Sequence, residues 1–134
     1  MSNFANSHRT LLRCVSALIC GAAILFNNSA SAGDDAAAHT NRLAYDTAIR
    51  CFVADAYASD ERRKVGDEVK ADSYKAKSRE SFDLAYTAGD KIGLTDKQVG
   101  RDLDFAQQTE LPRLIRDQHY LLDTASTCKA LGLM

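Results

Sequence analysis

The stretch that decides the fold is YDTAIRCFVADAY, which runs from Tyr45 to Tyr57. Its apolar side chains recur at steps of three and four residues, a spacing that places them on one face of an α-helix. They are Tyr45, Ala48, Ile49, Phe52, Val53, Ala56 and Tyr57. The pattern predicts an amphipathic helix that begins after Thr40 as its N-cap and carries Cys51 beside its buried stripe.

A second helix is predicted to follow. Ser59-Asp60-Glu61 suggests a break and a new N-cap. The next stretch is polar at first, with Val65 and Val69 as its early apolar anchors. Two glycines, Gly89 and Gly93, each offer a possible end to this helix.

The C-terminal third has the sharpest local signal, a capping box at Thr95-Asp-Lys-Gln98. The helix that it opens runs to around Gln108, and Pro112 either starts a new helix or kinks a continuous one. Beyond it, one regular stripe predicts a final core helix that Gly132 ends. The stripe consists of Leu111, Leu114, Ile115, Gln118, Leu121, Leu122, Ala125 and Cys128.

The first 32 residues have a different composition from the rest. They contain no acidic residue, and the 13 residues of Cys14–Phe26 carry no charge, which suits the core of a signal peptide and is too short for the roughly 20 residues of a membrane span. Ala30-Ser31-Ala32 predicts cleavage between Ala32 and Gly33 and a periplasmic or secreted protein with no stable membrane insertion. An uncleaved membrane anchor is the alternative.

Four cysteines become two after this cleavage, because Cys14 and Cys20 leave with the signal segment. In an oxidising compartment the remaining pair, Cys51 and Cys128, is expected to form a disulfide. A catalytic thiol or a metal ligand would need a neighbouring base or further ligands, and the sequence offers neither. The mature chain, 33–134, is thus predicted to be one all-α domain, a compact bundle of about four helices with its first and last helices crosslinked.

The same chain lacks the motifs of catalysis and of cofactor or metal binding. The mature part has two histidines, His39 and His119, and His119 with Asp123 supplies two candidate ligands where zinc needs three or four. Asp102 and Glu110 lie eight residues apart and are read as solvated surface acids. We therefore expect no enzyme, no cofactor and no metal site.

The charge of the mature chain narrows the choice of partners. Its 15 basic and 18 acidic side chains give a net charge of −3, which favours neither a nucleic acid nor an anionic membrane. By elimination the sequence favours binding to another protein of the cell envelope. The alternatives are an envelope stress or holding protein that opens in acid and an enzyme whose site has no recognised motif.

A resemblance supports the binding interpretation. The stretch Ala48–Tyr57, with Cys51 six residues before Tyr57, and a second cysteine in the last helix resemble the layout of periplasmic immunity proteins that neutralise type VI secretion amidases. Those proteins bear a signal peptide and are helical and disulfide-bonded, so the resemblance implies an inhibitor of another protein. A concave, partly apolar surface would favour such a partner, and a deep polar pocket would favour an enzyme.

Overall fold

The computed structural model describes the backbone of residues 8–134 and the side chains of residues 34–134. The predicted signal segment, 1–32, and its cleavage site between Ala32 and Gly33 lie outside the described side chains. The chain divides into two compact units, 1–37 and 38–134, and the second contains the hydrophobic core. Within the described residues, no helix combines the length and the apolar character needed to cross a membrane.

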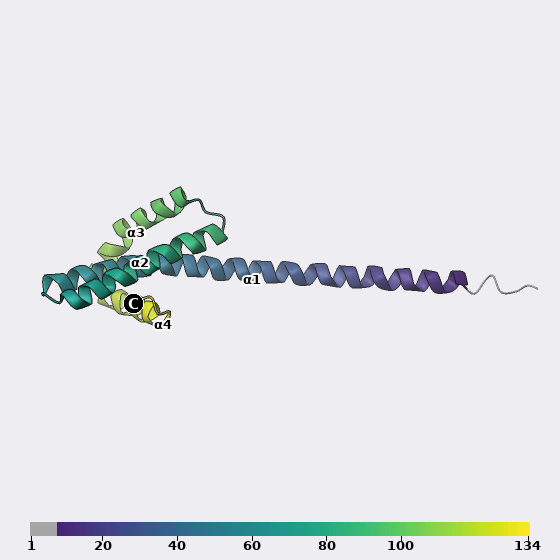
Figure 1. Cartoon of the computed structure of the whole chain (residues 1–134), viewed down its shortest axis with the longest axis horizontal. Helices are drawn as coiled ribbons and strands as arrows, with labels where there is room; N and C mark the ends of the chain where they lie inside the picture. The colour runs from purple at the N-terminus through teal and green to yellow at the C-terminus, as the bar shows by residue number, and fades with distance from the viewer. Residues whose placement is uncertain (1–7) are drawn as a thin grey trace, which may run out of the picture. The chain divides into compact units, whose positions relative to one another are not determined.

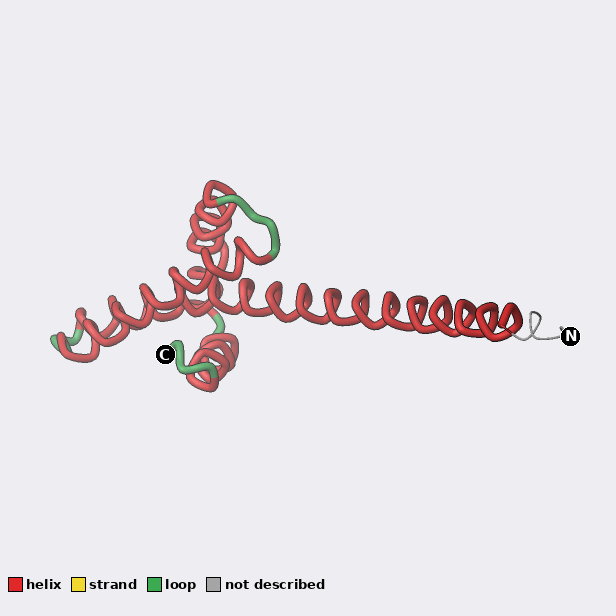
Figure 2. The backbone as a smooth tube through the Cα atoms, turned by 45° about the vertical axis from the view of Figure 1, so that its right-hand side comes forward, coloured by secondary structure: helices red, strands yellow, loops and turns green. Residues whose placement is uncertain are grey.

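The chain folds into helices joined by short loops (Figures 1 and 2). They are α1 (His8–Lys64), α2 (Glu68–Lys91), α3 (Asp96–Arg116) and α4 (Gln118–Ala130). The predicted all-α class, with about four helices, is confirmed. In the second unit, side chains of α2, α3 and α4 pack against α1, those of α4 being the partly buried Tyr120 and Leu121. The buried cluster contains Tyr45, Ala48, Ile49, Val53, Ala54, Ala85, Ala88, Val99, Leu103, Ala106 and Leu114.

The first two predicted helix boundaries are wrong. Ser59-Asp60-Glu61 lies inside α1, because polar residues alone do not end a helix that has tertiary packing along its face. Thr40 also lies inside α1, although residues 34–40 are exposed. The break comes at Gly66, whose positive φ of 79° suits a glycine, and Asp67 then caps α2 by accepting from the backbone N–H of Lys70. Val65 and Val69, the predicted anchors, are 73% and 83% exposed beside this turn.

The connection between α2 and α3 follows the sequence more closely. Gly93 has a positive φ of 78°, and the N–H of Leu94 donates to the carbonyl of Gly89, which closes the helix end. The capping box of Thr95 and Gln98 is present in both directions. Gly89 itself does not end α2. A Cβ at this position would lie 2.6 Å from Cγ2 of Val99, so the glycine lets α2 and α3 approach closely.

The final stripe is divided by a break that the sequence pattern did not show. Pro112 lies inside α3, which continues to Arg116, and Asp117 then caps α4 by accepting from the N–H of Tyr120 at 3.0 Å. Because the break changes the direction of the chain, Ile115 and Leu122 are 58% and 60% exposed rather than buried. Gly132, with a positive φ of 71°, does end α4 as predicted.

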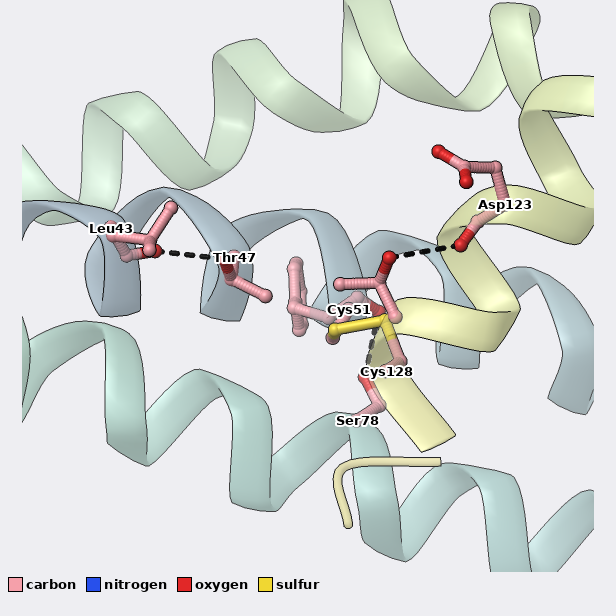
Figure 3. The surroundings of a disulfide bond; sticks show 8 residues. Leu43, Thr47, Cys51, Ser78, Asp123 and Cys128 are labelled. Atoms are coloured by element: carbon pink, nitrogen blue, oxygen red, sulfur yellow. Dashed lines mark hydrogen bonds between the residues drawn. A yellow bond between two sulfur atoms is a disulfide. The ribbon is translucent and has the colours of Figure 1, made fainter. Parts of the chain in front are cut away.

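The predicted crosslink joins the first and last helices. Sγ of Cys51 on α1 and Sγ of Cys128 on α4 are 2.03 Å apart, and their Cα atoms are 5.7 Å apart (Figure 3). Both residues are fully buried. The disulfide thus fixes the end of α4 against the middle of the part of α1 that belongs to the second unit.

Candidate functional site

An apolar groove of about 670 Å³ lies between α1, α2 and the end of α4. Among the described residues, those that line it carry no charge: Thr40, Leu43, Ala44, Thr47, Leu84, Ser126, Thr127, Ala130, Leu131 and Leu133. Two of them, Leu43 and Leu131, are 59% and 58% exposed. Large apolar side chains that face solvent around a hollow mark a surface that can bind an apolar group.

Helical spacing builds the α1 wall of this groove. Leu43, Thr47 and Cys51 follow at intervals of four residues and therefore share one face of α1, which leads to the disulfide with α4 (Figure 3). The hydroxyl of Thr47 donates to the carbonyl of Leu43 at 2.8 Å, and that of Thr127 donates to the carbonyl of Asp123 at 3.0 Å. Because these hydroxyls are bonded within their own helices, both threonines add little polarity to the groove.

The other wall depends on the turn that follows α4. Leu131 and Leu133 lie on either side of Gly132, and the N–H of Leu133 donates to the carbonyl of Cys128 at 2.8 Å. A side chain of α2 also holds this turn, since Nζ of Lys77 donates to the carbonyl of Gly132 at 3.0 Å. The same ammonium donates to Oε2 of Glu80 at 2.8 Å. Lys77 therefore connects α2 to the turn that carries Leu131 and Leu133.

A buried carboxyl group lies further along the same face of α1. Asp55 is one helical turn beyond Cys51 and is fully buried. Within the described part of the chain, neither of its carboxyl oxygens has a hydrogen-bond partner. Burial raises the pKa of Asp55 to about 7, an effect that the charge of Lys77 opposes and that of Glu80 reinforces.

The packing of α2 on α1 explains why Asp55 is enclosed. The hydroxyl of Ser59 donates to the carbonyl of Ala71 at 2.8 Å, and the hydroxyl of Ser78 donates to the carbonyl of Phe52 at 3.2 Å. Asp55 lies between Phe52 and Ser59 along α1, so these two contacts bracket it. Sequence reasoning missed this residue, although its position four residues after Cys51 and four before Ser59 placed it on the same face as the predicted disulfide.

Asp102 and Glu110, which the sequence suggested were ordinary surface acids, each accept a hydrogen bond from a tyrosine of another helix. Tyr45 of α1 donates to Oδ2 of Asp102 at 2.7 Å, and Tyr120 of α4 donates to Oε2 of Glu110. Burial, and then these hydrogen bonds, raise the pKa of both tyrosine hydroxyls. The two carboxylates thus connect α3 to α1 and to α4, a structural role.

His39, His119 and Asp123 are exposed. In the part of the chain that the structure describes, no group of three or more histidine, cysteine, aspartate and glutamate side chains could hold a metal ion. No family model matches the chain, and no curated protein or solved structure matches it either.

Proposed function

We propose that the mature chain is a non-enzymatic periplasmic or secreted protein that binds another protein through the apolar groove. The observation that carries the proposal is the pair of half-exposed leucines, Leu43 and Leu131, which lie on walls of one uncharged hollow. Exposed apolar side chains gathered around a hollow are a feature of protein-binding surfaces.

The lining defines the chemistry of the partner. A charged or strongly polar segment would lose its hydration in the groove, and the threonine hydroxyls of Thr47 and Thr127 already have acceptors within their own helices. An apolar side chain would lose nothing and would gain the burial of Leu43 and Leu131. The occupant is the apolar face of a helix or of an extended segment in the partner, as in other helix-in-groove complexes.

The finer proposal is that the partner is an enzyme and that binding inhibits it. Its support is the cysteine layout around Cys51 and Cys128, which resembles that of periplasmic immunity proteins against secreted amidases. The disulfide suits such a role, because it fixes α4 and the adjoining turn against α1 and so limits the entropy lost on binding.

The holding-protein alternative requires the fold to open in acid. Asp55 acts in the opposite direction, because a carboxyl group buried without a partner is more easily accommodated when it is protonated. An enzymatic role for Asp55 is also disfavoured, because a fully buried side chain cannot contact a substrate in this conformation. Both considerations favour the binding role.

The decisive experiment captures partners with the protein expressed from the full chain and then measures each purified candidate by calorimetry against matched variants. Leu43→Asp and Leu131→Asp each place a charge in the groove, and a bound apolar partner would remove water from that charge. Each variant should therefore raise the Kd tenfold or more, which corresponds to a loss of about 1.4 kcal/mol or more in binding free energy. Leu122→Asp is the control, because Leu122 is equally exposed on α4 but does not line the groove. Equal affinities for all variants would refute the groove as the binding surface.

Inhibition is tested separately with the captured partner. A cell-wall amidase that loses activity in stoichiometric complex with the wild-type chain, and keeps it with Leu131→Asp, would support the immunity role. A tight complex with a protein that has no enzymatic activity would contradict that role and leave the binding proposal intact.

A further inference from the structure

Lys77 of α2 holds the turn that borders the groove, because its ammonium donates to the carbonyl of Gly132 and to the carboxylate of Glu80. The next residue of α2, Ser78, donates to the carbonyl of Phe52, which places Lys77 beside the part of α1 that carries Asp55. The charge of Lys77 opposes the rise in the pKa of Asp55. The side chain is 33% exposed, so its flexible stem has room to move. Lys77 thus bonds Gly132 and Glu80, while Asp55 has no hydrogen-bond partner.

The surroundings of Asp55 limit what can respond to its ionisation. From α2, the charged groups that act on it are Lys77 and Glu80. From α1 and α4, Cys51 and Cys128 are bonded to each other and do not titrate. An ionised Asp55 would be a buried anion without a donor, which is costly unless a cation moves toward it.

We propose that ionisation of Asp55 draws Lys77 away from the carbonyl of Gly132 and so releases the turn that carries Leu131 and Leu133. The shape of the apolar groove therefore depends on pH. The proposal rests on the proposed function of the groove for its meaning, because it describes the regulation of that site. In acid the turn is docked on α2, and in alkaline solution it is free to change.

The cost of the exchange is small on the side of the turn. Gly132 is exposed, so water can replace Lys77 at its carbonyl. Once the turn loses its attachment to α2, the bond from the N–H of Leu133 to the carbonyl of Cys128 opens more often. The change is therefore local and leaves the disulfide and the helices in place.

Amide hydrogen exchange of the full-length protein, measured by NMR without any partner, tests the idea. The protection factor of the Leu133 amide, corrected for the intrinsic pH dependence of exchange, should fall about tenfold between about pH 5.5 and about pH 8.5, which bracket the pKa of about 7. Asp55→Asn should remove this fall and keep the amide protected throughout. Asp104→Asn, which alters an exposed carboxylate on α3, should behave as the wild type.

A second variant keeps the test decisive if Asp55→Asn does not fold. Lys77→Met removes the bond to Gly132 and should lower the protection of Leu133 at every pH. Wild-type pH dependence in Asp55→Asn, or full protection in Lys77→Met, would overturn the proposal. Since no partner is present, this result is independent of whether Leu43→Asp and Leu131→Asp impair binding, so the two proposals can fail separately.

Discussion

Two positions along one face of α1 depart in opposite ways from the usual distribution of polar and apolar groups. At one position Asp55 is a carboxyl group fully buried under α2, and at the other Leu43 borders a groove while 59% exposed. A partly exposed Asp55 and a covered Leu43 would each favour folding. The structure thus gives up stability at two places only a few helical turns apart, and the disulfide lies between them.

The two positions differ in what would stabilise them. The exposed leucines can be covered by a partner, whereas Asp55 can be relieved by a proton. The first dependence is on another molecule and the second is on pH. Lys77, which touches the groove turn and acts on Asp55, is the residue through which the two could be coupled.

The largest effect should come from removing the disulfide that lies between the two positions. Replacing Cys51 and Cys128 by alanine should lower the free energy of unfolding by about 4 kcal/mol, because the crosslink closes a loop of 77 residues and restricts the unfolded chain. Urea denaturation of the oxidised wild type and the double variant measures the difference. A loss below about 1 kcal/mol would mean that helix packing alone holds α4 in place.

The pH dependence of stability should reveal Asp55. Its pKa rises from 3.8 in the unfolded chain to about 7 in the fold, so the folded state binds the proton more tightly. The stabilisation is therefore complete below about pH 4 and is lost as pH rises through about 7, by at most about 4 kcal/mol. Urea denaturation across this range should show the slope in the wild type.

Asp55→Asn is the matched variant for this slope, because asparagine keeps the shape of the side chain without its charge. It should flatten the profile between about pH 4 and about pH 7 and raise stability relative to the wild type above that range. If stability depends on pH as steeply in Asp55→Asn as in the wild type, other groups cause the dependence. Asp55 would then not be the position that a proton stabilises.

Gly89 tests the close packing of α2 against α3 and α1. Gly89→Ala adds a methyl group that would lie 2.6 Å from Val99 and 3.3 Å from the ring of Tyr45, so we expect a loss of about 1–3 kcal/mol from overpacking. Gly100→Ala is the control, since its Cβ would make an ordinary 3.5 Å contact with Tyr86 and alanine is the better helix former. Thermal denaturation of both should show opposite signs.

The smallest effect on stability should be found in the groove. Leu131→Ser replaces an exposed leucine and should change the free energy of unfolding by no more than about 0.5 kcal/mol. Chemical denaturation measures this change. A loss of about 2 kcal/mol or more would show that the leucine stabilises the isolated fold, and the groove would then need no partner to explain it.

The helical periodicity was enough to predict the class of fold because each α-helix repeats its contacts every three to four residues. The capping box at Thr95 and the turn at Gly132 were also predictable, since both depend on residues adjacent in the chain. The break at Asp117 was not, because the apolar spacing continues across it. Two helices that meet at an angle can keep one regular spacing, and Ile115 and Leu122 are exposed as a result.

The sequence by itself determined the all-α class, because apolar spacing is a property of the chain. It also predicted the pairing of Cys51 with Cys128, which are the two cysteines of residues 33–134. Only the tertiary structure decided that Asp55 is buried, that Gly89 lies inside α2, and that an uncharged groove forms beside the disulfide. These features depend on which helix packs against which face. That choice is made by contacts between residues far apart in the chain, which local spacing does not encode.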